Sequence, residues 1–70
     1  MEDLSTYKIV ELVGTSPTSW EEAVQNVVDR ATKTLRNLRI VEVIQLDAKI
    51  GDNNKISHYR AKVKLSFKFE

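Results

Sequence analysis

Hydrophobic and polar residues recur along the chain with two periods, that of a strand and that of a helix. Each segment with one regular period predicts one element of secondary structure. Residues 7–13 are rich in strand-forming side chains and stop at Gly14, which predicts a first strand. Apolar side chains then recur at helical spacing over residues 19–37, with charged residues opposite them, which predicts one long amphipathic helix. Its apolar face comprises Trp20, Ala23, Val24, Val27, Val28, Ala31, Leu35 and Leu38.

The second half of the chain predicts a hairpin of two long strands. Residues 40–50 and 56–69 flank Gly51-Asp52-Asn53-Asn54, residue types that tolerate positive φ and favour a turn. The last strand alternates strictly, so one of its faces should pack on the helix. That apolar face comprises Tyr59, Ala61, Val63, Leu65, Phe67 and Phe69.

These elements predict an α+β fold with the order β-α-β-β, a three-stranded antiparallel sheet packed on one long amphipathic helix. A wholly antiparallel sheet requires the first strand to pair with the last, so that the last strand is central. A first strand lying parallel to the second is the alternative. We favour the antiparallel sheet, because a long strand with clean alternation is typical of a sheet with one face on a helix.

The start of the helix carries two candidate capping boxes, in which a hydroxyl caps a free amide and a glutamate reaches back. Thr18 with Glu21 and Ser19 with Glu22 both have the required spacing.

The chain is short enough that its own core should be marginal. Seventy residues make one domain, 1–70, with an expected ordered core of about residues 6–69. There is no cysteine and only one histidine, His58, so disulfides and a multi-histidine metal site within one chain are excluded. Association with further copies is the remaining way to stabilise such a domain. The first strand agrees, since Ile9 and Val13 on one face and Val10 and Leu12 on the other are all apolar.

The charge balance argues against two classes of partner. Eleven basic and ten acidic residues give a net charge of +1, which is not typical of a nucleic-acid-binding domain. No apolar stretch approaches the roughly 20 residues of a membrane helix. Residues 1–6 do not resemble a secretory signal. We therefore expect a cytoplasmic protein that binds neither nucleic acid nor membranes.

Three segments together resemble the dodecin family, and the resemblance extends from about residue 7 to residue 70. They are the opening Tyr7-Lys8-Ile9-Val10-Glu11-Leu12-Val13-Gly14-Thr15-Ser16, the segment Lys33-Thr34-Leu35-Arg36-Asn37-Leu38-Arg39, and the closing Val63-Lys64-Leu65-Ser66-Phe67-Lys68-Phe69-Glu70. The resemblance implies a homododecamer of cubic symmetry that binds flavins such as FMN or riboflavin in pairs. It implies storage or sequestration as the role, and no enzymatic activity.

The positions that correspond to the family's flavin pocket differ in this chain. Ile40 stands where the family has a tryptophan that stacks on the flavin, and Arg60 stands where it has a glutamine. Asp47 falls at an arginine position, while Lys68 keeps the basic residue. This pattern is similar to a tryptophan-lacking branch of the family, for which calcium binding has been proposed.

The residues at these positions allow more than one interpretation. By the parity of its strand, Asp47 should share a face with Arg60 and form an ion pair with it or with His58. Alternatively, Asp47 is an oxygen ligand for a hard cation, but calcium takes six to eight oxygens, so carbonyls or symmetry copies would have to contribute. The same parity places Ile40 on the face of Leu46, where it should fill core or interface volume.

A basic stripe on the last strand is also open to two interpretations. Arg60, Lys62, Lys64 and Lys68 could form an anion site, or they could be a solvated face balanced by neighbouring carboxylates, which we favour. No catalytic constellation and no glycine-rich phosphate loop is present.

Three functional hypotheses follow. The first is a dodecin shell that still takes a flavin or another aromatic, phosphate-bearing ligand. The second is a shell that has lost flavin and binds a metal ion or nothing. The third, an unrelated nucleic-acid module, is the least favoured.

Overall fold

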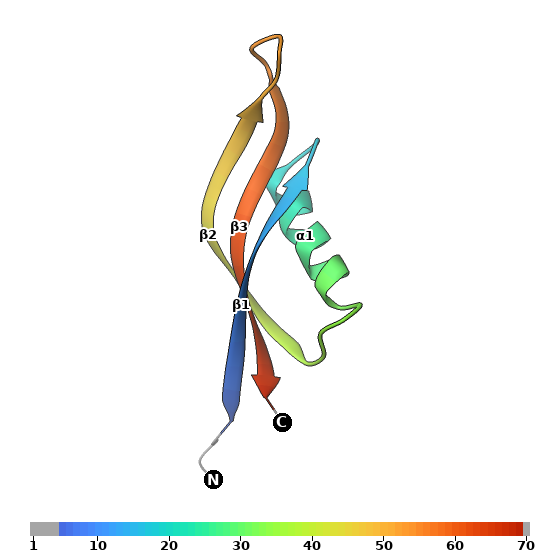
Figure 1. Ribbon diagram of the computed structural model, residues 1–70, viewed down its shortest axis with the longest axis vertical. Helices are drawn as coiled ribbons and strands as arrows, with labels where there is room; N and C mark the ends of the chain where they lie inside the picture. The colour runs from blue at the N-terminus through green and yellow to red at the C-terminus, as the bar shows by residue number, and fades with distance from the viewer. Residues whose placement is uncertain (1–4, 70) are drawn as a thin grey trace.

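The computed structural model describes residues 5–69, which form three strands and one helix (Figure 1). The elements are β1 (Thr6–Ser16), α1 (Trp20–Ala31), β2 (Leu38–Ile50) and β3 (Ile56–Phe69). The strand order is β1-β3-β2, and both pairings are antiparallel. The predicted β-α-β-β order and the central position of the last strand are therefore confirmed.

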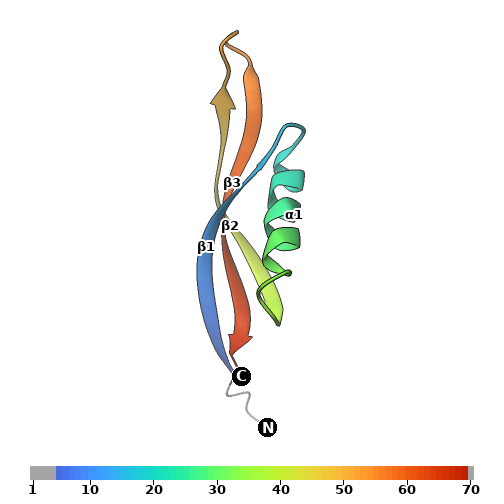
Figure 2. The ribbon, with the colours of Figure 1, turned by 45° about the vertical axis from the view of Figure 1, so that its right-hand side comes forward.

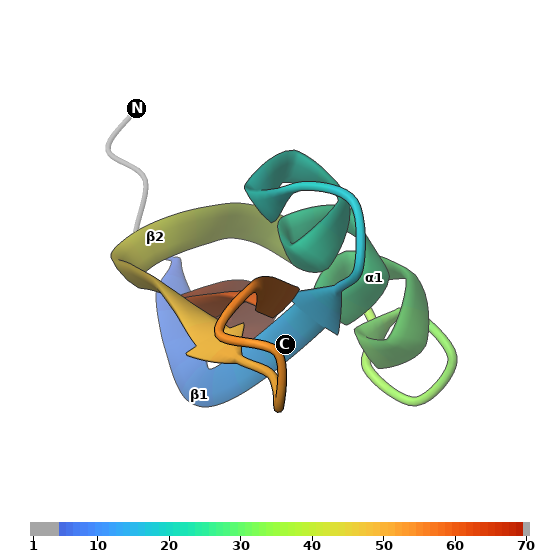
Figure 3. The same ribbon diagram turned by 90° about the horizontal axis from the view of Figure 1, so that it is seen from above.

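The helix lies against one face of the sheet, and the core forms between them (Figures 2 and 3). The buried apolar residues are Ala23, Val27 and Ala31 of α1 and Ala61, Val63 and Leu65 of β3. Their spacing confirms the predicted alternation of the last strand, although the side chain of Phe69 lies outside what the structure describes. We call the side of the sheet that faces away from α1 the open face.

Gly14 sets how closely β1 can approach the helix. A Cβ atom at this position would lie inside 3.0 Å of both the Ala23 carbonyl oxygen and the Val27 side chain. The backbone of Gly14 needs no positive φ, so the requirement for glycine comes from space alone. The strand and helix can therefore pack together here only because Gly14 has no side chain.

The turn before α1 is organised by a buried serine. Ser16 accepts hydrogen bonds from the amides of Thr18 (3.0 Å) and Ser19 (3.3 Å) and donates one to Glu22 Oε1 (2.7 Å). Ser19 is the N-cap and accepts from the Glu22 amide at 3.0 Å, as the second predicted capping pair requires. The Glu22 carboxylate, however, bonds to Ser16, because the Ser19 amide that a capping box would offer it already donates to the Ser16 hydroxyl.

The helix is shorter than predicted: the expected span of residues 19–37 is wrong, and α1 ends at Ala31. The chain leaves the helix through a tight turn in which the Leu35 amide donates to the Ala31 carbonyl at 2.7 Å. Asn37 then adopts a positive φ of 61°, which no helix interior allows. Leu35 and Leu38 still pack against the core, so the apolar period continues beyond the residues that are helical.

The predicted face of Ile40 is also wrong. Val43 pairs with Val63 but Gln45 pairs with Lys62, so β2 contains one extra residue between them. A bulge of this kind reverses the parity of the strand on either side of it. Ile40 therefore lies opposite Ser66 on the open face, whereas Leu46 lies opposite Ala61 on the helix face.

The molecule is elongated for its size. Its radius of gyration is 14.7 Å, against about 11 Å expected for a compact domain of this length. Its accessible surface is 5588 Å², against about 4,450 Å² expected for a folded monomer of this mass. The β2–β3 hairpin extends beyond one end of α1 and the first part of β1 extends beyond the other (Figure 1). A single copy thus buries little of its own surface.

Candidate functional site

All four predicted site residues lie on the open face. The strand register places Ile40 opposite Ser66, Asp47 opposite Arg60, and Lys68 opposite Tyr7. Arg60 and Lys68 are nevertheless eight positions apart on β3, which corresponds to about 26 Å along the strand. The structure therefore brings Asp47 and Arg60 together and leaves Ile40 and Lys68 at the far end of the same face.

Asp47 and Arg60 form a two-pronged ion pair between β2 and β3. The Arg60 Nε–H donates to Asp47 Oδ1 at 2.7 Å, and Nη2–H donates to Oδ2 at 2.8 Å. The hydrogen bonds from Arg60 lower the pKa of the Asp47 carboxyl, and those same bonds raise the pKa of Arg60. The predicted cross-strand pair thus forms with Arg60, while the His58 ring lies beside the Ser57 hydroxyl at 3.2 Å.

The basic stripe is accompanied by carboxylates. Lys62 forms an ion pair with Glu11 of β1 at 3.3 Å. Lys64 is flanked in the register by Glu11 on one side and Glu42 on the other. With Arg60 bound to Asp47, three of the four basic residues have acidic neighbours, which favours the solvated-face interpretation over an anion site.

On this face, a single chain supplies few ligands for a metal ion. Within residues 5–69, no group of three or more histidine, cysteine, aspartate or glutamate side chains is placed to hold a metal ion. Both carboxylate oxygens of Asp47 already accept hydrogen bonds from a cation, Arg60. A cation at Asp47 would have to displace Arg60 and take further oxygens from carbonyls or other copies.

Ile40 contributes an apolar surface instead of an aromatic ring. It is 57% exposed, as is Ile9, and both pair with Ser66 from opposite sides. The open face therefore carries an aliphatic patch near one end and the Asp47–Arg60 pair near the other.

Trp20 is a contact of this site that sequence reasoning missed. Its indole N–H donates to the main-chain carbonyl of Asp47 at 2.9 Å, across 27 residues of sequence. Its ring meets that of Tyr59 edge to face, with centroids 4.9 Å apart and an interplanar angle of 71°. No local pattern signals this contact, because it depends on how the helix start lies over β2 and β3.

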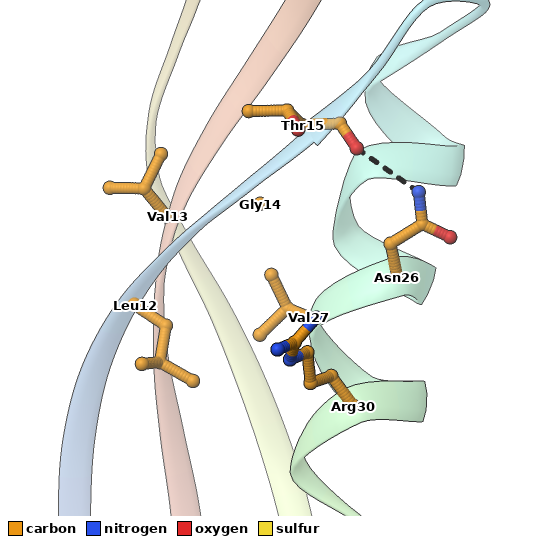
Figure 4. Close-up of a pocket in the computed structure, with 7 residues that line it drawn as sticks. All are labelled: Leu12, Val13, Gly14, Thr15, Asn26, Val27 and Arg30. Carbon is orange, nitrogen blue, oxygen red and sulfur yellow. Dashed lines mark hydrogen bonds between the residues drawn. The ribbon is translucent and has the colours of Figure 1, made fainter.

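A groove of about 610 Å³ runs between β1 and α1, away from the predicted site residues (Figure 4). It is lined by Leu12, Val13, Gly14, Thr15, Asn26, Val27 and Arg30. Asn26 bridges it, donating from its side-chain amide to the Thr15 carbonyl at 3.0 Å. This bond ties the end of β1 to the helix.

The strand β2 exposes most of its apolar side chains. It is an edge strand, and none of its residues is buried although many of them are isoleucine or valine. Ile40, Val41, Val43, Ile44, Leu46 and Ile50 are each between 37% and 68% exposed. The helix packs chiefly over β1 and β3, so Val41, Val43 and Leu46 on its own side of the sheet stay partly exposed. Ile40 lies on the open face, which the helix does not cover.

The comparison with known proteins identifies the family. The family model Dodecin matches residues 6–70, nearly the whole chain. The chain belongs to the dodecin family. The resemblance seen in the sequence is therefore confirmed.

Two curated dodecins align over almost their full length. The calcium dodecin of Mycobacterium tuberculosis is 42% identical over 65 residues, covering 93% of this chain and 90% of the relative. The dodecin of Thermus thermophilus is 41% identical over 64 residues, covering 91% of each.

Solved dodecin structures share the fold. The dodecin from Streptomyces coelicolor superposes with a TM-score of 0.91 at 40% identity, covering 99% of this chain and 97% of the other. The calcium dodecin of M. tuberculosis, described as calcium-chelating with a novel calcium-binding site, has a TM-score of 0.83 at 41% identity, covering 94% and 93%. The predicted dodecin-like α+β fold is thus confirmed. No helix in residues 5–69 is long and apolar enough to cross a membrane.

Proposed function

We propose that this dodecin is the subunit of a closed homo-oligomer, expected to contain twelve copies, which binds and stores a small ligand and is not an enzyme. The observation that carries the proposal is the uncovered apolar surface of β2. Soluble monomers rarely leave a contiguous apolar patch of more than a few hundred Å² in water. The elongated shape supports the same conclusion, since the chain exposes about 1,100 Å² more than a compact monomer of its mass.

The family's flavin is expected to bind weakly to this chain. A stacking ring contributes about 1 to 3 kcal/mol, and the aliphatic Ile40 cannot provide it. Arg60 is a donor-only group in place of a glutamine, and two of its N–H groups, Nε–H and one on Nη2, already donate to Asp47. If the two losses add, flavin affinity falls by roughly two to three orders of magnitude relative to a tryptophan-bearing dodecin. The protein should therefore purify without the yellow colour of a flavin.

Calcium is the second candidate ligand, and the 42% identical calcium dodecin favours it. Asp47 is the residue of the predicted site that could act as an oxygen ligand, because it is the carboxylate among the four positions. One carboxylate per chain is too few, so the proposal requires Asp47 from more than one copy, or carbonyl oxygens, around the ion. It also requires Arg60 to move away from Asp47.

Light scattering and calorimetry test the assembly and the ligand separately. Size-exclusion chromatography with light scattering should give a single closed oligomer at micromolar concentration, and a stable monomer would refute the assembly. Titration calorimetry with riboflavin, FMN and CaCl₂ then ranks the ligands. The double variant Ile40→Trp with Arg60→Gln should gain riboflavin binding, and Asp47→Asn should lose calcium binding.

Glu11→Gln is the matched control, because Glu11 is also a carboxylate paired to a basic residue of β3 on the open face. It should leave calcium binding unchanged. If calcium still binds to Asp47→Asn but no longer binds to Glu11→Gln, the calcium site does not lie at Asp47. No binding of any of the three ligands by the oligomer would refute the ligand part of the proposal.

A further inference from the structure

We propose that Trp20 is a positioning residue that holds the Asp47–Arg60 pair in place from the opposite side of the sheet. The inference rests on the proposed function, in which Asp47 and Arg60 stand at the ligand-binding positions. It adds a residue that touches neither the open face nor a ligand bound there.

The first contact fixes the backbone of Asp47. The Trp20 indole N–H donates to the Asp47 carbonyl at 2.9 Å. The Asp47 side chain points to the open face, where Arg60 holds it through two further hydrogen bonds. Asp47 is therefore held at its main chain from the helix side and at its carboxylate from the open side.

The second contact acts on the neighbour of Arg60. Tyr59 precedes Arg60 on β3, so its side chain points to the helix side, where its ring meets the Trp20 ring at 4.9 Å. One indole thus contacts both strands of the pair, with a hydrogen bond to β2 and a ring contact to β3. Such an edge-to-face contact is favourable beyond its buried area.

The N-terminus of α1, which carries Trp20, is held by several hydrogen bonds. Trp20 is the first residue of α1, directly after the N-cap Ser19. The buried Ser16 hydroxyl binds the Ser19 amide and the Glu22 carboxylate on either side of it. A ligand that separates Asp47 from Arg60 must therefore disturb the contacts of Trp20 with Asp47 and Tyr59. Its binding should change the surroundings of the indole.

The single tryptophan allows a direct test in the assembled, ligand-free protein. Asp47→Asn and Arg60→Gln should shift both the indole N–H resonance in a ¹H–¹⁵N spectrum and the tryptophan emission maximum. The matched control is Lys62→Gln, which breaks the Lys62–Glu11 pair two positions along the same strand and face. The control should leave both signals where they are in the parent protein.

The reverse experiment removes the donor and keeps a smaller aromatic ring. Trp20→Phe keeps an aromatic ring near Tyr59 but has no N–H for the Asp47 carbonyl. The Arg60 Nε–H resonance should move toward the position of an unpaired arginine. The references in the same spectrum are Arg30, Arg36 and Arg39, for which no ion pair is seen within residues 5–69. A purely structural role of Trp20 would lower stability without moving this resonance.

The outcomes separate this inference from the proposed function. Indole signals that respond equally to Lys62→Gln and Arg60→Gln, or to neither, would overturn the positioning role. An unmoved Arg60 resonance in a folded, assembled Trp20→Phe variant would overturn it too. If Trp20→Phe does not fold, the open-face variants still decide the question. Neither experiment contains a ligand, so failure to bind flavin or calcium leaves its result unaffected.

Discussion

Replacing Gly14 with alanine adds a single methyl group and should nevertheless weaken the packing of β1 on α1 strongly. The added Cβ would lie inside 3.0 Å of the Ala23 carbonyl oxygen and of the Val27 side chain. The carbonyl belongs to the helix backbone and cannot rotate away, and valine has little freedom at χ1 within a helix. The strand and the helix must therefore separate to make room.

The expected cost is at the upper end of the range for overpacking, about 3 kcal/mol. A domain of 70 residues has a free energy of unfolding of roughly 3.5 to 10 kcal/mol, so this is a large share of it. For a domain of this size, a loss of about 3 kcal/mol lowers the melting temperature by roughly 12 to 24 °C. The measurement is thermal and guanidinium unfolding followed by circular dichroism, at one fixed subunit concentration because assembly contributes to stability.

Gly51→Ala is the matched control, since a Cβ there would meet Ser57 Cβ at an ordinary 3.4 Å and the backbone needs no positive φ. It should change the free energy of unfolding by no more than about 0.5 kcal/mol. If Gly14→Ala and Gly51→Ala unfold at the same temperature and denaturant concentration, the close approach of β1 to α1 is not what requires glycine at position 14.

The core, the helix cap and the ion pair each lead to one further prediction. Val27→Asp places an unpaired charge at a residue that is only 6% exposed. It should lower the free energy of unfolding by several kcal/mol and abolish folding and assembly. A folded oligomer seen by light scattering would contradict the position of Val27 in the core between helix and sheet. Ser19→Ala removes the N-cap and should cost about 1 kcal/mol in chemical denaturation, with Thr18→Ala, which is not the cap, as the comparison. The hydrogen bonds from Arg60 lower the pKa of Asp47 in the folded protein, so the stability that Asp47 contributes is complete above its ordinary pKa of 3.8 and is lost as the pH falls through the lowered value. An acid titration of stability should therefore flatten in Asp47→Asn below pH 3.8, and equal acid sensitivity of parent and variant would show that the pair does not contribute.

The sequence predicted those features that depend on unbroken periodicity. The alternation of β3 located Ala61, Val63 and Leu65 in the core and correctly suggested a central strand. It also placed Asp47 beside Arg60, where the ladder is regular from Gln45–Lys62 to Lys49–His58. The register shift nearer the turn leaves the extra residue, Ser57, on β3 and not on β2.

The predictions that were wrong concern places where the hydrophobic period breaks. Leu35 and Leu38 continue the helical spacing but reach the core from a turn and from β2, so apolar spacing alone could not show that α1 stops at Ala31. The bulge at Ile44 carries no marker such as glycine, and for that reason Ile40 was assigned to the wrong face. The bond from Trp20 to the Asp47 carbonyl joins residues far apart in sequence, so only the packed fold reveals it.

The irregular pairing of β2 has a consequence for how copies of this protein can grow into larger particles. A flat, apolar edge strand would accept further strands one after another and build a fibre. The β2–β3 ladder instead shifts register at three places, near Arg39, Ile44 and Ile50, and such shifts bend and twist a strand. A bent edge fits neighbours only at particular angles, which favours a ring or shell that closes on itself over an open-ended filament. We therefore expect the same bulges that move Ile40 to the open face also to limit the size of the assembly.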